Sequence, residues 1–334
     1  RRSRGLGSDA GVASTRLVGI DLGGTKIEGV VLDEGQQVVF RDRLPTEAWL
    51  GYEHILRRVG EVAALCGSHA PGVEVIGLGS PGSVSTRTGG MKNCNTTCLN
   101  GRFLKDDLEQ QLGLRVLLEN DANLFALAEA NAGAGQGAEL VFGVILGTGV
   151  GGGFVHRGSL LRGPQHLAGE WGHHSIDPGG PECYCGQRGC VEAILAGPAL
   201  ERRYVQETGD HAAMPAILAA YRRGDAAAVD VMRTFLDRFG RALANVINII
   251  DPDIVVLGGG LSNIDELYSE GRTAVARYVF NDELRTPIVR HRLGDSAGVI
   301  GAALLTAPAA PQPFPGAARP SPPPTAVGRS SPGR

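Results

Sequence analysis

The sequence DLGGTK at residues 21–26 and the sequence GTGVGGG at residues 147–153 decide the fold class of this chain. Each follows a short apolar run, Leu17–Ile20 in the first case and Leu140–Leu146 in the second, of the kind that forms a β-strand. Glycines lack Cβ atoms and let backbone N–H groups turn toward a phosphate, and a threonine in each loop adds a hydroxyl donor. Two such loops in two halves of the chain predict a protein that binds phosphates in a cleft between two α/β lobes.

Short β-rich runs alternate with helical stretches along most of the chain. Apolar residues recur at three- and four-residue steps between Val229 and Ile250, which predicts a long amphipathic helix that ends at Asp251-Pro252. The order strand, hairpin, helix, strand occurs twice. We therefore predict an α/β fold of two related lobes, residues 16–131 and residues 132–306, divided near Asn131–Gln136.

Both ends of the chain differ in composition from the lobes. Residues 1–15 carry no apolar period and predict a disordered arm. Residues 307–334 hold nine of the 19 prolines, at positions 308, 311, 313, 315, 320, 322, 323, 324 and 332. A segment so rich in proline cannot continue a helix or a central strand, so we predict a disordered, solvated tail.

The composition excludes several classes of protein. Lys+Arg 32 against Asp+Glu 35 gives a net charge of −3, so no basic excess points to a nucleic acid partner. No apolar stretch approaches the ~18–20 residues that span a bilayer, so no membrane association is predicted. Six cysteines without a preceding signal-peptide pattern favour a reducing, cytoplasmic location. A P-loop motif is absent from the sequence, and the G-x-G-x-x-G match at residues 147–152 leads into another strand, which disfavours dinucleotide binding.

A third glycine cluster, residues 258–260, follows a predicted strand at Ile254–Leu257. Open α/β sheets bind ligands at the carboxyl ends of their strands, so this cluster predicts contact with adenosine or ribose, with a simple turn as the alternative. The predicted nucleotide-binding residues are Asp21, Gly23, Gly24, Thr25, Lys26, Gly147, Thr148, Gly149, Gly258, Gly259 and Gly260. Asp21 is also a candidate to organise a magnesium ion through its waters.

The sequence ENDAN at residues 119–123 lies where a predicted strand becomes a helix. Asp121 could take the proton from an attacking sugar hydroxyl, as catalytic-loop aspartates do in kinases. A purely structural role as the helix N-cap is the alternative, because Asp and Asn both favour that position. Beside two phosphate loops, the catalytic role is favoured.

The residues GEWGH at 169–173 and CYCGQRGC at 183–190 form the sharpest local pattern. One imidazole with the thiolates of Cys183, Cys185 and Cys190 satisfies tetrahedral Zn²⁺, and four protein ligands leave no open position, so the metal would be structural. Both His173 and His174 are candidate imidazole ligands from the residues alone. A disulfide is the alternative, and it would leave one of the three thiols unpaired.

Together these motifs, in this order across roughly residues 16–305, resemble the ROK (repressor, open reading frame, kinase) family of sugar kinases. The resemblance implies two actin-like, hexokinase-type lobes that close on ATP–Mg²⁺ and a sugar, with Asp121 as general base. It also favours His173 over His174 as the zinc ligand, and implies a homodimer as a candidate assembly. The residues expected to bind the sugar are Asn95, Asn120, Glu170, His173 and Glu192.

Within the family, residues 91–101 and 257–263 look most like the bacterial fructokinase (manno-fructokinase) branch, which predicts D-fructose phosphorylated at its 6-hydroxyl. Cys98 departs from this branch, which usually has tryptophan there. A glucokinase or an N-acetylhexosamine kinase is the alternative enzyme. A sugar-responsive transcriptional repressor is the alternative of another class, and it would need a helix-turn-helix module ahead of Asp21, where only 20 residues without helical period stand.

Overall fold

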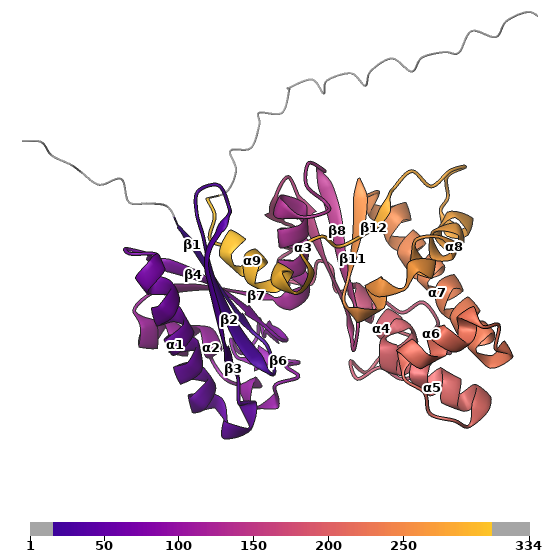
Figure 1. Cartoon of the computed structure of the whole chain (residues 1–334), viewed down its shortest axis with the longest axis horizontal. Helices are drawn as coiled ribbons and strands as arrows, with labels where there is room; N and C mark the ends of the chain where they lie inside the picture. Colours follow the sequence, from indigo (N-terminus) through magenta and orange to yellow (C-terminus); the bar gives the residue numbers. More distant parts are fainter. Residues whose placement is uncertain (1–15, 309–334) are drawn as a thin grey trace, which may run out of the picture.

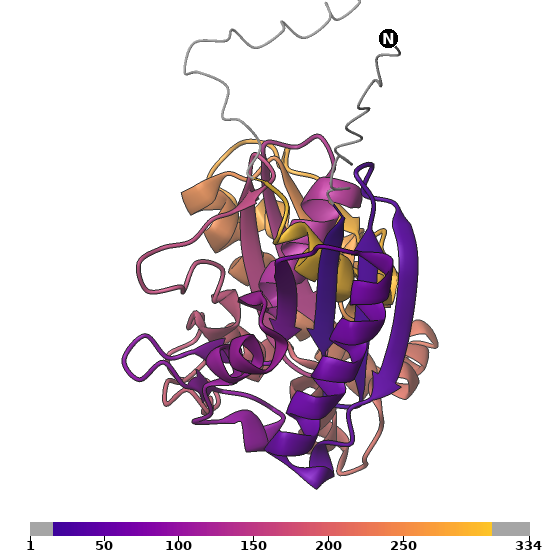
Figure 2. The same ribbon diagram turned by 90° about the vertical axis from the view of Figure 1, so that its left-hand side faces the viewer.

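The computed structural model describes residues 16–308, which form two lobes side by side (Figure 1). Figure 2 views them from the side of the first lobe, which lies in front of the second. The predicted arm at residues 1–15 lies outside the described residues, and so does the predicted tail apart from residues 307 and 308. No helix between residues 16 and 308 is long and apolar enough to cross a membrane.

The first lobe is built on a five-stranded sheet with the order β3-β2-β1-β4-β7. Strands β1, β2 and β3 are antiparallel neighbours, whereas β4 and β7 run parallel to β1. The strands are β1 Leu17–Leu22, β2 Lys26–Leu32, β3 Val38–Pro45, β4 Val75–Ser80 and β7 Arg115–Asn120. Helices α1 (Tyr52–His69) and α2 (Leu104–Leu112) cover one face, and a small hairpin of β5 (Ser83–Val84) and β6 (Met91–Lys92) lies near the cleft end.

The second lobe repeats this arrangement with the order β10-β9-β8-β11-β12. Its strands are β8 Leu140–Leu146, β9 Val150–His156, β10 Ser159–Leu160, β11 Ile254–Gly258 and β12 Ile288–Arg290. A larger group of helices covers one face: α4 Val191–Leu195, α5 Gly197–Thr208, α6 Met214–Arg222, α7 Ala226–Ile250 and α8 Glu270–Tyr278. Short 3₁₀ segments complete the chain: η1 Ala48–Leu50, η2 Thr97–Leu99, η3 Trp171–His173, η4 Gly260–Asn263, η5 Asp265–Leu267 and η6 Gly294–Ser296.

The long predicted helix is α7, which begins at Ala226, three residues before the predicted Val229. Asp225 caps it, because its carboxylate accepts a hydrogen bond of 2.9 Å from the Ala228 N–H. The apolar side of α7 is buried against the second sheet and helices α5, α6 and α8, which makes it the centre of the largest core cluster. Asp251 ends the helix in the left-handed conformation, with φ 51°.

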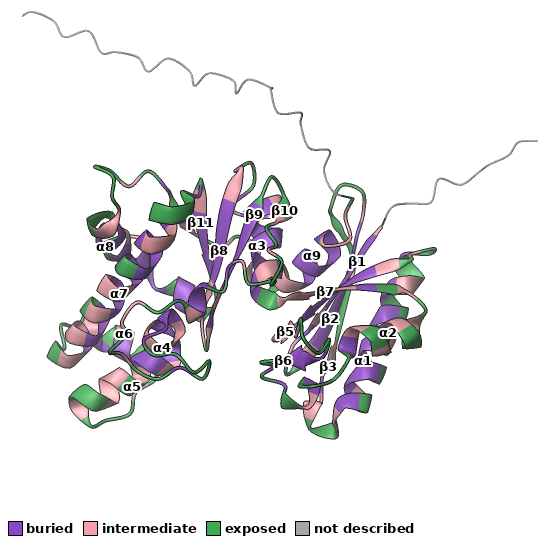
Figure 3. Ribbon diagram, turned by 180° about the vertical axis from the view of Figure 1, so that it is seen from behind, coloured by how far each residue is buried: buried purple, intermediate pink, exposed green. Residues whose placement is uncertain are grey.

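Two helices lie on the lobe opposite to the one that their sequence position suggests. Helix α3 (Asp121–Ala132) packs on β8 and β9 of the second sheet, and α9 (Ala297–Leu304) packs on β1, β2 and β4 of the first. The predicted division into residues 16–131 and 132–306 separates the two sheets but not these helices, so as a division into domains it stays a proposal. The seven residues from Leu124 to Ala130 are all buried (Figure 3), so apolar periodicity gave no sign of which sheet α3 would cover.

Glycines allow α9 to touch the first sheet without intervening side chains. A Cβ atom on Gly77 would lie 1.7 Å from the Ala302 carbonyl oxygen, and one on Gly19 would lie 2.2 Å from the Ala303 nitrogen. Helix α9 also contacts α3 directly, where a Cβ on Gly301 would lie 2.1 Å from the Leu124 carbonyl oxygen. The two exchanged helices therefore form the close-packed joint between the lobes.

Candidate active site

Two cavities meet at the carboxyl ends of β1, β7, β8 and β11. The first, which we call cavity A, has a volume of about 510 Å³. The second, cavity B, has about 360 Å³. Asp121 and Ile145 line both of them, so the carboxylate of Asp121 lies where the two spaces adjoin.

Asp121 is the first residue of α3, directly after β7. The N-cap of α3 is Asn120, whose side-chain oxygen accepts a hydrogen bond of 2.8 Å from the Ala122 N–H. The alternative role predicted for Asp121, the helix cap, therefore belongs to its neighbour. Asp121 Oδ1 lies 2.8 Å from the same N–H, and its side chain reaches the cleft surface.

The cleft floor raises the pKa of two carboxyl groups. Enclosure by protein atoms, which displaces bulk water, raises the pKa of Asp121. At the end of β1, burial raises the pKa of Asp21 to about 6, with further increases from the negative charges of Asp121 and Glu28 and a decrease from Lys26. Two carboxyl groups with raised pKa values in one cleft are typical of a functional site.

The first glycine loop stands apart from the described lining of both cavities. Gly23, Gly24, Thr25 and Lys26 line neither cavity, whereas Asp21 lines cavity B. Lys26 Nζ forms an ion pair of 2.8 Å with the buried Glu28, which Arg41 also contacts. The predicted nucleotide contacts of this loop therefore stay predictions.

The second glycine loop lies in the wall of cavity A. Gly147, Thr148 and Gly149 all line it. Glu192 at the start of α4 accepts a hydrogen bond of 2.8 Å from the Val150 N–H. A Cβ on Gly149 would lie 2.7 Å from that same Glu192 carboxylate, so glycine is required for the contact.

The third glycine cluster divides between two roles. Gly259 and Gly260 line cavity B. Gly258 does not: it is buried in β11, where a Cβ would lie 2.4 Å from the Phe125 ring. Gly258 lines neither cavity A nor cavity B, so its predicted ligand contact stays a prediction. Its close contact with Phe125 gives Gly258 a packing role.

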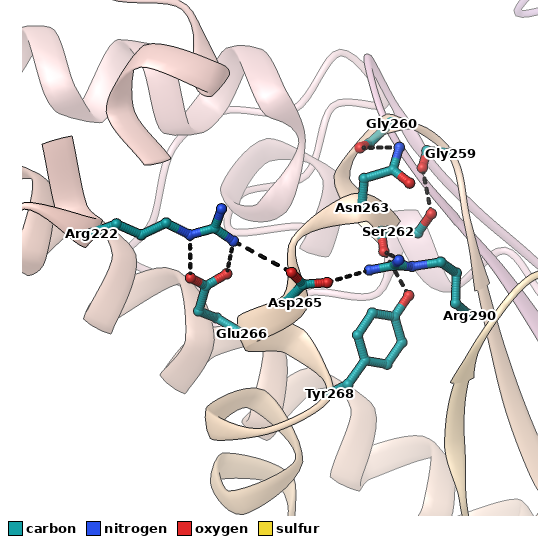
Figure 4. Close-up of polar contacts among 9 residues, drawn as sticks. All are labelled: Arg222, Gly259, Gly260, Ser262, Asn263, Asp265, Glu266, Tyr268 and Arg290. Carbon is teal, nitrogen blue, oxygen red and sulfur yellow. Dashed lines mark hydrogen bonds and ion pairs between the residues drawn. The ribbon is translucent and has the colours of Figure 1, made fainter. Parts of the chain in front are cut away.

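A polar network supports the turn that follows Gly259 (Figure 4). The Arg290 Nε donates to the Ser262 carbonyl at 3.0 Å, and the Tyr268 hydroxyl donates to the same oxygen at 2.7 Å. Arg290 also pairs with Asp265 at 2.8 Å and lies over the Tyr268 ring. These contacts fix η4 against β12, and with it one wall of cavity B.

A buried carboxylate fixes the opposite wall. Glu129 of α3 has no exposed surface, and it accepts hydrogen bonds from the N–H groups of Ala134 (2.8 Å), Arg292 (3.0 Å) and Leu293 (2.8 Å). The first of these segments joins α3 to β8 within the second lobe, and the second joins β12 to α9 and so connects the two lobes. The second continues into His291 and residues 294–298, several of which line cavity B.

All five predicted sugar-binding residues line cavity A: Asn95, Asn120, Glu170, His173 and Glu192. The sequence analysis missed Tyr184, Asn93 and Ser83, which line it too. Tyr184 lies between two candidate metal ligands, a position that could have pointed to it. Cys98 does not line the cavity; its Sγ lies 3.8 Å from the Ala48 carbonyl oxygen, against the core of the first lobe.

One imidazole and three thiols converge beside cavity A. The ligand atoms of His173, Cys183, Cys185 and Cys190 all lie within 4.8 Å of one another. His173 Nδ1 lies 3.6 Å from Cys183 Sγ, and its Nε2 lies 3.0 Å from the Tyr184 hydroxyl. These donor types and distances fit a tetrahedral zinc site.

The structure distinguishes the two candidate histidines and disfavours the disulfide. His174 lies outside the group, with its Nε2 3.3 Å from Asn245 Nδ2 on α7. Cys185 Sγ and Cys190 Sγ are 3.6 Å apart, well beyond the S–S bond length of about 2.05 Å. His173 is therefore the imidazole of this group.

The ROK family model matches residues 17–308. The chain belongs to the ROK family. It is 35% identical over 297 residues to the N-acetyl-D-glucosamine kinase of Photobacterium profundum, a match that covers 86% of this chain and 98% of that protein.

Two solved structures share the fold of this chain. The ROK hexokinase from Thermus thermophilus superimposes with a TM-score of 0.79 at 36% identity, covering 87% of this chain and 97% of that one. The Streptomyces griseus ROK glucokinase, solved with glucose and AMPPNP, has a TM-score of 0.69 at 32% identity, covering 86% and 98%. The predicted α/β fold with two hexokinase-type lobes is confirmed, and so is the membership among ROK sugar kinases. The predicted fructokinase branch has no support in these relatives.

Proposed function

We propose that this ROK protein is an ATP-dependent kinase that phosphorylates the 6-hydroxyl of a hexose, with N-acetyl-D-glucosamine as the first candidate and D-glucose as the second. The observation that carries the proposal is the position of Asp121 between cavity A and cavity B. A carboxylate at the boundary of two spaces can reach a hydroxyl in one while the phosphate to be transferred lies in the other.

Asp121 would act as the general base. It takes the proton of the sugar 6-hydroxyl as the oxygen attacks the γ-phosphorus, and the bond from that phosphorus to the β–γ bridging oxygen breaks to release ADP. The raised pKa of Asp121 makes its carboxylate a stronger base.

The lining of cavity A suits a polyol. Carboxylates, amides, an imidazole and a phenol face one space, and each can donate or accept one hydrogen bond to a sugar hydroxyl. Such a site rejects an analogue that lacks a paired hydroxyl far better than an apolar pocket rejects a missing methylene. The polar residues that line cavity A therefore support recognition of a sugar by the stereochemistry of its ring hydroxyls.

Magnesium and zinc would serve different roles. Asp21, which lines cavity B, would organise a magnesium ion, whose charge neutralises the phosphates of a bound nucleotide. The group of His173, Cys183, Cys185 and Cys190 would hold zinc with no open position, so it orders the loop that carries Tyr184 and precedes Glu192. The chain's own residues, not the metal, then contact the sugar.

The choice of sugar rests on relatives. The match to the N-acetylglucosamine kinase covers 86% of this chain and 98% of that protein, and the glucokinase and hexokinase structures favour an aldohexose.

The test is a panel of sugars with ATP–Mg²⁺, scored by ADP release and by kcat/KM. N-acetylglucosamine or glucose should exceed fructose and mannose at least tenfold, about 1.4 kcal/mol of transition-state preference. If fructose leads by that margin, the substrate assignment is wrong. If none of the four sugars stimulates ADP release, the kinase assignment is wrong.

A further inference from the structure

A third cavity, cavity C, lies in the second lobe away from the cleft. It has a volume of about 410 Å³ and shares no lining residue with cavity A or cavity B. Its walls are the segment around Asp177–Pro181, the short helix α4, and helices α5 and α7. Nothing in the proposed reaction uses it.

The polar part of the cavity C lining is rich in hydrogen-bond donors. Four arginines line it, Arg188, Arg202, Arg203 and Arg238, against a single carboxylate, Asp177, which already pairs with Arg238 at 3.2 Å. Arg188 pairs with Glu182, which lies outside the lining, at 2.7 Å. A guanidinium group only donates hydrogen bonds, so the donors left over on this wall suit a ligand with acceptors.

Several of these donors have no partner among residues 16–308. The Arg203 Nε is buried without a hydrogen bond, although the rest of that guanidinium pairs with Asp230 at 3.2 Å. The exposed Arg202 has no ion pair, and neither Gln206 nor Thr234 forms a side-chain hydrogen bond within that range. A buried donor left unpaired costs stability, and Arg203 Nε is such a donor. Arg202 and Gln206 are exposed and hydrated, and both stand free to bind acceptors in the same cavity.

The rest of cavity C is apolar. Ile194, Leu200 and Phe235 contribute its floor, together with two alanines. An apolar floor beneath a rim of donors matches a small molecule with a ring or hydrocarbon body and a phosphate or carboxylate head. Free inorganic phosphate would satisfy the rim but leave the floor uncovered.

We propose that cavity C is a binding site for a small amphipathic organic anion, separate from the reaction cleft. The site adjoins the reaction machinery through α4: Ile194 faces cavity C, while Glu192 on the same short helix faces cavity A and bonds Val150. Arg188, in the rim, lies between two of the candidate zinc ligands in the sequence. A ligand in cavity C therefore touches the element that presents Glu192.

The experiment measures binding of phenyl phosphate and of inorganic phosphate to the full chain by calorimetry. Phenyl phosphate should bind with one saturable site and at least tenfold more tightly than inorganic phosphate, because only the former covers the apolar floor. Arg202→Glu should weaken phenyl phosphate at least tenfold, since it removes an unpaired cation and adds a negative charge. Arg202 lines neither cavity A nor cavity B, so this loss assigns the site whatever the outcome of the kinase assay.

The matched control is Arg223→Glu. Arg223 is also exposed, lies after α6 in the same lobe, and lines none of the three cavities. Three results would overturn the proposal: no saturable binding of phenyl phosphate, equal weakening by both substitutions, or equal affinity for both probes. A fourth would do so too: if Arg202→Glu dissociates a dimer of the wild-type chain and the wild type binds no phenyl phosphate, cavity C is covered by a second copy.

Discussion

The two glycine loops look alike in sequence but are held in different ways. The loop at residues 147–153 is tied to Glu192 of α4 and to the start of α5, and it lines cavity A. Among residues 16–308, the loop at residues 21–26 is tied only to its own lobe, through Thr46 and Glu28, and Asp21 alone of its residues lines a cavity. Under the proposed function, residues 147–153 would belong to the sugar side of the cleft and residues 21–26 to the nucleotide side.

The largest expected effect is that of replacing Asp121, which lies between cavity A and cavity B. Asp121→Asn keeps the shape of the side chain but removes the base, so kcat should fall by ~10²–10⁴-fold while sugar and nucleotide affinities change little. Steady-state kinetics with a folding check by circular dichroism measures this. A variant that keeps more than about a tenth of wild-type kcat would show that Asp121 is not the base.

The second prediction tests whether loss of the metal group affects sugar binding without affecting nucleotide binding. Cys185→Ser opens the metal group, so the protein should lose its zinc and the KM for sugar should rise at least tenfold, while nucleotide binding changes less than about twofold. Elemental analysis and calorimetry give both quantities. The control is Cys98→Ser, a cysteine outside the group. Equal loss of sugar and nucleotide binding would contradict the separation.

The third effect concerns the first loop's own carboxylate and its pH dependence. Because the folded protein raises the pKa of Asp21 from 3.8 to about 6, protonated Asp21 favours the folded state below about pH 4, and that contribution is lost as the pH rises through 6. Above pH 6 the wild type therefore carries a cost of up to about 3 kcal/mol that Asp21→Asn lacks.

Urea unfolding in EDTA at about pH 7.5 and about pH 4.5 measures this difference in the free energy of unfolding. The Asn variant should gain about 3 kcal/mol relative to wild type at the higher pH and about 1 kcal/mol at the lower, where Asp21 of the unfolded chain is already mostly ionised. Asp282→Asn, at an exposed site, should be neutral at both. A gain of the same size at both pH values would rule out titration of Asp21 as the cause.

The smallest effect compares the loop hydroxyls. Thr148 lines cavity A and Thr25 lines neither cavity, so Thr148→Val should lower kcat/KM about fivefold, and Thr25→Val by less. Parallel kinetics on the two variants measures the ratio. A larger loss for Thr25→Val would mean that the first loop contributes more to the bound state than its position here indicates.

The features that sequence reasoning predicted are those that depend on nearby residues. The glycine loops, the strand-to-helix turn at residues 119–123 and the cysteine cluster are local, and the residues of each lie within a few positions of one another. The placement of α3 and α9 is not local, because an evenly apolar helix fits either sheet. Gly258 was predicted to contact ligand since it shares a run with Gly259, yet only the packing of Phe125 distinguishes the two. Tyr184 was not predicted to line the sugar site, because it lies between Cys183 and Cys185 and this segment was interpreted only as metal-binding.

The glycine-to-helix contact between the first sheet and α9 has a consequence for how the chain folds. Strands β1 and β4 are synthesised long before α9, which covers most of one face of their sheet. Until that helix is made, Leu17, Val30 and Leu32, which pack with residues of α9 in one core cluster, lie on a face without this cover. Contacts of such long sequence separation form slowly. The lobe that begins with β1 is therefore completed only after the strands of the other lobe have been made, and we expect its unfinished face to be exposed to aggregation until then.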